Sequence, residues 1–204
     1  HLASLSLPYC QKYPRSALDV NIVGTFNLLE ACMKNNVKRI VFASSSSVYG
    51  NAVYSPMDEK HPLEYRDFYA ATKLASEALF RTFYFKYNLA YISLRFMNIY
   101  GPRLDYSGAY VAIIMKIIDR LENNLSPVIY GDGSQQRSYC YSTDTARATV
   151  DALFSNKTNN IRPFYVETES ENDQSKFVCK KILELREKGM TFNQIADHLN
   201  KKGI

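Results

Sequence analysis

Short apolar runs alternate along the chain with longer segments whose apolar residues recur at helical spacing. Residues 39–43 and 90–97 are apolar, have polar flanks, and suit strands that are buried on both faces. Shorter runs of the same kind lie at 127–130 and 164–166, and residues 1–4 have the character of a strand end. We expect a strand at each of these places.

The segments between the runs predict helices. They cover residues 16–35, 69–88, 108–121 and 143–154. The first carries apolar residues around most of its circumference, which indicates a largely buried helix. Strands that alternate with helices are typical of the α/β class, with a parallel sheet covered by helices on both sides.

Tyr69 and Lys73 lie four residues apart at the start of one predicted helix. Residues at this spacing share a helix face, so the phenol and the ammonium point the same way. A cation beside a phenol lowers its pKa toward the range in which a general base works at neutral pH. The pair is a candidate proton acceptor. Spacing alone leaves a solvated helix face as the alternative.

Four consecutive serines at 44–47 follow the first predicted strand. Ligands of open α/β sheets bind at the carboxyl ends of the strands, so hydroxyl groups at this point indicate a binding site. A serine-rich turn without a ligand is the alternative.

Composition is that of a globular protein. The 204 residues are 46% hydrophobic and 22% charged, with a net charge of +5. No apolar run approaches the ~20 residues of a membrane span, so we expect no membrane partner and a cytoplasmic location. The four cysteines lack metal-ligand spacing, so we expect reduced thiols and no metal site. We expect His61, which lies in a loop, to be exposed.

The basic charge is concentrated at the end of the chain. Residues 175–204 hold seven basic and three acidic residues, and the polar, acidic stretch 167–174 is typical of a linker. Two short predicted helices joined at Gly189 make a helix-turn-helix candidate. This tail resembles the helix-turn-helix segment of site-specific recombinases, which would suit phosphate contacts with DNA. A docking hairpin and a remnant of gene fusion are the alternatives.

Six motifs occur in a fixed order, at residues 1–3, 21–31, 44–50, 69–73, 94–103 and 130–137. With them, residues 1–166 resemble the extended short-chain dehydrogenase/reductases, specifically the NAD-dependent sugar-nucleotide epimerases and dehydratases, and most of all the UDP-glucose 4-epimerases. The resemblance implies a partial Rossmann-like, doubly wound parallel sheet with a small substrate-binding lobe, followed by the C-terminal helical hairpin.

The resemblance also implies roles for single residues. Tyr69 would be the catalytic base, Lys73 would lower its pKa and bind the nicotinamide ribose, and Ser45 would bind the reacting hydroxyl. Ser44 and Ser46 compete with Ser45 for that role. The NAD-binding residues would be Asn21, Ser44, Tyr69, Lys73 and Phe96. The substrate-binding residues would be Ser45, Asn98 and Arg137.

Dehydratases of the family carry acidic residues just after the catalytic serine or threonine, where this chain has Ser46 and Ser47. We therefore predict epimerisation of a nucleotide sugar, at C4 of a UDP-hexose, through a transient 4-keto sugar, with a place in carbohydrate metabolism and polysaccharide biosynthesis. A reductase or decarboxylase of the same family is one alternative. A non-enzymatic binding module with a DNA-binding tail is the other.

The resemblance divides the chain into four parts. Residues 1–100 would be the C-terminal part of the NAD-binding Rossmann domain, 101–166 elements of the substrate-binding lobe, 167–174 the linker, and 175–204 the basic tail. The Gly-rich phosphate loop of the family would lie upstream of His1, so we expect roughly 70 further residues there. We also expect a homodimer.

Overall fold

The computed structural model of the chain describes residues 1–54, 57–104, 113–129, 131–133, 137–155 and 164–165. They fall into two compact units: residues 1–54, 57–104, 140–155 and 164–165 belong to the first, and residues 113–129, 131–133 and 137–139 belong to the second. The predicted linker and helical hairpin lie outside the described residues.

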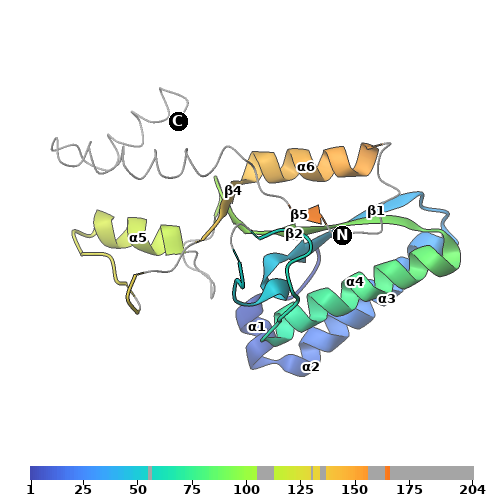
Figure 1. Cartoon of the computed structure of the whole chain (residues 1–204), viewed down its shortest axis with the longest axis horizontal. Coiled ribbons are helices and arrows are strands. Elements are labelled where there is room, and N and C mark those ends of the chain that lie inside the picture. Colours follow the sequence, from blue (N-terminus) through green and yellow to red (C-terminus); the bar gives the residue numbers. More distant parts are fainter. Residues whose placement is uncertain (55–56, 105–112, 130, 134–136, 156–163, 166–204) are drawn as a thin grey trace. The chain divides into compact units, whose positions relative to one another are not determined.

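A three-stranded parallel sheet forms the centre of the first unit, in the order β1-β2-β5 (Figure 1). Strand β1 spans Arg39–Ser45, β2 spans Ala90–Phe96 and β5 spans Phe164–Tyr165. Three predicted strands are therefore confirmed. Residues 1–4 form no strand, so that prediction is wrong, although His1 bonds to the edge of β1: its amino group donates to Val41 O at 2.7 Å, while His1 O accepts from the amide of Ala43 at 3.1 Å.

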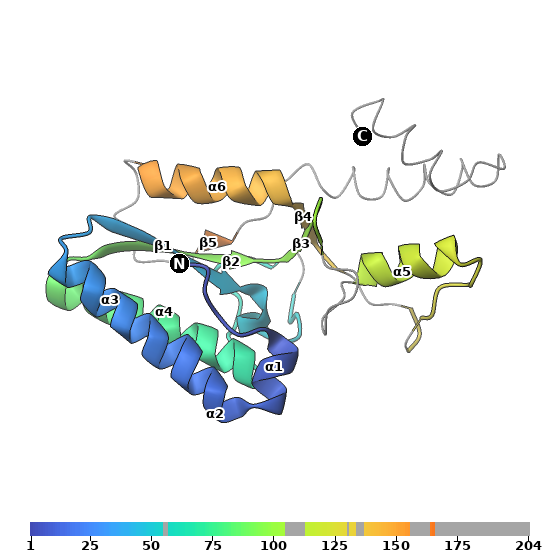
Figure 2. The ribbon, with the colours of Figure 1, turned by 180° about the vertical axis from the view of Figure 1, so that it is seen from behind.

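Helices cover both faces of this sheet, as Figures 1 and 2 show. Helices α3 (Gly24–Lys34) and α4 (Phe68–Tyr87) pack on one face, and α6 (Ser142–Phe154) packs on the other. The predicted α/β class with a doubly wound, Rossmann-like parallel sheet is confirmed in this unit. Alternate residues of a strand point to opposite faces, so each strand supplies two separate hydrophobic clusters.

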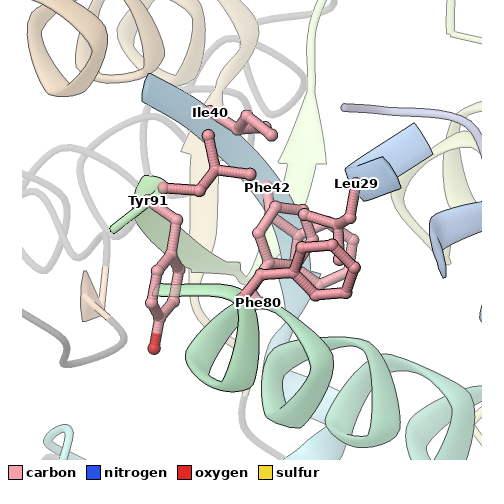
Figure 3. Packing of buried hydrophobic residues seen from close by; sticks show 7 residues of the cluster. Leu29, Ile40, Phe42, Phe80 and Tyr91 are labelled. Atoms are coloured by element: carbon pink, nitrogen blue, oxygen red, sulfur yellow. The ribbon is translucent and has the colours of Figure 1, made fainter. Parts of the chain in front are cut away.

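The cluster under α3 and α4 is the larger one (Figure 3). Phe80 of α4 stacks on Phe42 of β1 with ring centroids 4.8 Å apart, and both side chains are almost fully buried. Leu29, Ile40 and Tyr91 surround this pair. On the opposite face, the smaller cluster consists of Val41, Ile92 and Leu94, with Phe96 and Ala152 packed against it.

The region before α3 differs from the single helix expected over 16–35. Helices α1 (Leu7–Lys12) and α2 (Pro14–Ala17) come first, and a π-helical segment η1 (Leu18–Val23) joins α2 to α3. A π turn carries an additional residue within a helix, and such turns are frequent at functional sites. Here Asn21 of the π segment is buried and faces α4.

Smaller elements complete the described part. A two-stranded sheet pairs β3 (Asn98–Tyr100) with β4 (Tyr139–Tyr141), and α5 spans Ile113–Glu122 in the second unit. Residues 127–129 form no strand, so the prediction at 127–130 is wrong for its described part. Its run is too short to fix an extended segment without a neighbouring strand. No helix of the described residues has the length and apolar character to cross a membrane.

Candidate active site

The last two residues of β1, Ser44 and Ser45, present their hydroxyls to different surroundings. Ser44 is buried and donates to the carboxylate of Glu77 on α4. Ser45 is half-buried and caps the 3-10 helix η2 (Ser46–Tyr49) by accepting a hydrogen bond from the amide of Ser47 at 3.2 Å. Ser45 is therefore the more accessible of the two hydroxyls, and its predicted role stays a prediction.

Helix α4 begins at this end of the sheet. Its N-cap is Asp67, whose carboxylate accepts from the amide of Ala70 at 2.8 Å, and Asn88 ends it in the left-handed conformation with φ 55. The helix runs antiparallel to β1, since Phe80 packs on Phe42 and Glu77 contacts Ser44. Its first turns, with Tyr69 and Lys73, therefore lie at the carboxyl end of β1.

Lys73 is the buried centre of this arrangement. Its side chain is 3% exposed, and Nζ donates to the carbonyl oxygen of Ala43 at 2.8 Å. Nζ also lies 5.4 Å from the ring centroid of the partly exposed Tyr69 and 5.1 Å from that of Phe42. Burial lowers the pKa of Lys73 from 10.5 to about 8, so the ammonium is the main form at pH 7. The expected proximity of the phenol and the ammonium is confirmed.

Asn21 ties the π segment to the start of α4. Its amide oxygen accepts from the amide of Leu5 at 2.7 Å, and its amide nitrogen donates to Thr72 Oγ1 at 3.0 Å. Thr72 in turn donates to the carbonyl of Tyr69 at 2.8 Å. Asn21 thus orients the helix turn that carries the phenol. Its predicted contact with NAD stays a prediction, as does that of Ser44.

The remaining predicted site residues lie further along the chain. Phe96 ends β2 beside Ser45 of β1 and packs against the smaller hydrophobic cluster. Asn98 opens β3, two residues later, and is half-buried. Arg137 is exposed and belongs to the second unit. The substrate-binding roles of Asn98 and Arg137 stay predictions.

Sequence reasoning missed a buried ion pair beneath the serines. Arg95 of β2 and Glu77 of α4 are joined by two hydrogen bonds, Nε to Oε1 at 3.0 Å and Nη2 to Oε2 at 2.8 Å. One available signal was the position of Glu77, four residues after Lys73 and so on the same helix face. A second was the arginine inside an apolar strand.

His61 is buried rather than exposed, so that expectation is wrong. The ring is 2% exposed, Nε2 accepts from the amide of Val53 at 2.9 Å, and Nδ1 lies 3.0 Å from Pro62 O. It meets the Tyr49 ring edge-on at 5.4 Å between centroids. A loop composition of Gly and Pro cannot reveal this, because the ring nitrogens bond to the loop's own main chain.

Gly50 connects η2 to that loop and has to be glycine. Its φ is +66, and a Cβ at this position would collide with the carbonyl oxygen of Glu64. The turn after the serines is therefore fixed by close main-chain packing. Among the described residues no group of three His, Cys, Asp or Glu side chains could hold a metal ion.

The chain is similar in sequence to known proteins. A putative UDP-glucose 4-epimerase of Methanocaldococcus jannaschii is 40% identical over 136 residues, which cover 66% of this chain and 44% of that protein. The human dTDP-D-glucose 4,6-dehydratase is 30% identical over 142 residues, covering 70% and 39%. The chain thus spans less than half the length of these curated relatives.

The fold is similar to that of a solved epimerase structure. The UDP-N-acetylglucosamine 4-epimerase of Methanobrevibacter ruminantium M1, in complex with UDP-N-acetylmuramic acid, superposes with a TM-score of 0.77 at 33% identity, over 89% of this chain and 59% of that chain. Residues 1–166 match the model of the NAD dependent epimerase/dehydratase family. A parallel sheet with helices on both faces, a tyrosine beside a buried lysine, and these similarities lead to one conclusion: the chain belongs to the NAD dependent epimerase/dehydratase family.

Proposed function

We propose that the protein epimerises a nucleotide sugar, a UDP-hexose at C4, through a transient 4-keto sugar. The observation that carries this proposal is the partly exposed Tyr69 phenol beside the buried Lys73 ammonium, at the strand end that Ser45 closes. Oxidation of a sugar hydroxyl needs a group that removes its proton, and a phenol next to a cation is suited to that task.

Each residue has a distinct task in this mechanism. Tyr69 accepts the proton of the sugar hydroxyl and returns it when the opposite face of the keto sugar is reduced. Ser45 binds the same oxygen and keeps it within reach of the phenol. Lys73 supplies the positive charge that favours phenolate, and its bond to Ala43 O holds this charge in place.

The site fits NAD at Lys73. An ammonium group has three donors, and within the described part of the chain one hydrogen bond, to Ala43 O, is formed. Two N–H groups therefore remain for the hydroxyls of a ribose. NAD held there would supply a reversible hydride acceptor for the sugar carbon. We assign Phe96 to the wall of this cofactor site because it ends β2 beside Ser45.

Two observations favour epimerisation over dehydration. Loss of water requires an acid and a base beside the reacting carbon, and the residues after Ser45 are Ser46 and Ser47. The Ser47 hydroxyl donates to Ser45 Oγ at 2.9 Å, so the group beside the Ser45 side chain is a hydroxyl and not a carboxylate. Asn98 and Arg137 are our candidates for the groups that bind the diphosphate.

The test is incubation of the full chain with NAD and UDP-glucose, followed by nuclear magnetic resonance and mass analysis of the product. We expect the C4 epimer with unchanged mass. Loss of water would indicate a dehydratase, and loss of carbon dioxide from a uronic acid substrate a decarboxylase. If none of several nucleotide sugars were converted while NAD bound, this assignment would be abandoned.

The wider setting follows from the same proposal. A nucleotide-sugar epimerase supplies sugars for polysaccharide biosynthesis, and we assign the protein to the cytoplasm. The homodimer remains a prediction that size determination in solution would test. DNA binding by residues 175–204 is testable as a salt-dependent affinity.

A further inference from the structure

The buried pair of Glu77 and Arg95 lies at the junction of three elements. Glu77 belongs to α4, Arg95 to β2, and Ser44 of β1 donates to the same carboxylate. All three residues are buried. The two parallel N–H···O bonds give the pair a fixed orientation, since a bidentate guanidinium contact defines both distance and plane.

The pair also contacts the far end of η2. The Arg95 guanidinium carbon lies 4.8 Å from the ring centroid of Tyr49, which is fully buried. Ser44 and Tyr49 lie on either side of Ser45 in the chain. The pair thus fixes the segment that carries Ser45 both before and after that residue.

The same carboxylate belongs to the helix of the proton acceptor. Glu77 lies one turn beyond Lys73, and Lys73 binds Ala43 O, the carbonyl that precedes Ser44. Two successive residues of β1, Ala43 and Ser44, are therefore attached to two successive turns of α4. This double attachment sets how β1 and its terminal serine are aligned along the helix.

A contribution to folding stability does not by itself explain why a charged pair occupies this buried position. Burying two charges costs desolvation energy, and apolar pairs of similar volume are often as stable or more stable in the same place. A fixed alignment of catalytic groups is a stronger reason, because small displacements of reacting groups lower rates steeply. We infer that Glu77 and Arg95 are positioning residues that hold Ser45 at its working distance from Tyr69 and Lys73.

This inference rests on the proposed function, and its first test is kinetic. We expect Arg95→Lys, which keeps the charge and loses the bidentate geometry, to lower kcat about 10-fold, and Glu77→Gln about 100-fold. KM should change less than about threefold in both, because neither residue touches the substrate. The exposed pair of Arg147 and Asp144 provides the control: Arg147→Met should leave kcat unchanged.

A double variant separates positioning from stability. Glu77→Leu/Arg95→Met removes both charges, so we expect its thermal midpoint to recover relative to Glu77→Gln. Under our inference kcat stays about 100-fold low in the stable double variant. Recovery of kcat together with the midpoint would overturn the inference. If the double variant does not fold, a normal kcat in Arg95→Lys would overturn it instead.

Hydrogen exchange tests the same idea without substrate or cofactor. The Ser47 amide, which donates to Ser45 Oγ, should exchange at least about 10-fold faster in the double variant, while amides in α6 keep their rates. Unchanged exchange at Ser47 would overturn the positioning role. A protein that shows the faster exchange but lacks epimerase activity even as wild type would contradict the proposed function and not this arrangement.

Discussion

Both halves of α4 bury side chains, but the buried side chains of the first half are mostly polar and those of the second half are aromatic. The first half buries Thr72, Lys73, Ser76 and Glu77, whereas the second half buries Phe80 and Phe83. In the first half each polar group has a hydrogen-bond partner on another element or on the helix itself. In the second half the contacts are ring against ring.

The two halves of the helix therefore have different tasks: one stabilises its packing on the sheet, and the other sets its alignment. Hydrogen bonds to buried polar groups are directional, add little net stability, and are costly when one partner is lost. Aromatic packing contributes most of the free energy and tolerates small rotations. The apolar half therefore fixes the helix to the sheet, and the polar half fixes its alignment. The following changes test this separation, in order of decreasing effect.

Tyr69→Phe removes the proton acceptor from the polar half. We expect kcat to fall by about 10²–10⁴-fold with little change in the free energy of unfolding, because the ring is retained. Tyr87→Phe, on the exposed end of the same helix, is the matched control and should keep full activity. An active Tyr69→Phe variant would contradict the mechanism.

Phe80→Ala removes a ring from the apolar half. We expect the free energy of unfolding to fall by about 3–5 kcal/mol, measured by urea denaturation, since the side chain is fully buried. Phe85→Ala removes a ring that is 65% exposed and should cost no more than about 0.5 kcal/mol. Equal losses at the two positions would mean that the apolar half is not the anchor.

Lys73 makes the stability of the polar half depend on pH. Because burial lowers the pKa of Lys73 from 10.5 to about 8, the unfolded chain keeps a proton between these pH values that the folded protein has released. The cost of burying the ammonium is fully present below pH 8 and is relieved as the pH rises. Relative to Lys73→Met, the wild type should gain roughly 3 kcal/mol across that range.

Denaturant unfolding at pH 7.5 and pH 10 measures this gain, and Lys86→Met is the control for loss of a positive charge on the helix surface. A difference between wild type and Lys73→Met that stays constant with pH would contradict the buried ammonium. In the same range kcat should decline, because a neutral amine no longer favours phenolate on Tyr69.

Asp67→Ala removes the cap from the first turn of α4. We expect a loss of about 1 kcal/mol in the free energy of unfolding, because the Ala70 amide loses its acceptor. Asp67→Asn keeps an acceptor oxygen and should lose less than half of that. If both variants were equally unstable, the charge of Asp67 and not its capping bond would account for the effect.

The sequence predicted the elements with the clearest hydrophobic pattern. The helix expected over 69–88 lies within one residue of α4, and the parallel strands begin where the apolar runs begin. The spacing of Tyr69 and Lys73 predicted that their side chains share a helix face. These successes rest on local periodicity, which tertiary contacts reinforce here and do not oppose.

The remaining features depend on contacts between distant segments. Residues 139–141 form a strand because β3 pairs with them, and no pattern of three residues shows this. The bond between Asn21 and Thr72 requires the π turn, which has no clear signal in its residues. Glu77 and Arg95 are separated by 18 residues and meet only when α4 has packed on β2.

The buried ring of His61 has a consequence for spectroscopy. The Val53 amide can only donate, so Nε2 must be the unprotonated nitrogen, and Nδ1 carries the hydrogen toward Pro62 O. The resonance of one main-chain amide thereby reports the tautomer of one imidazole. Labelling Val53 with nitrogen-15 would give a local probe for whether the loop beside the serines is closed, without any change to the residues of the site.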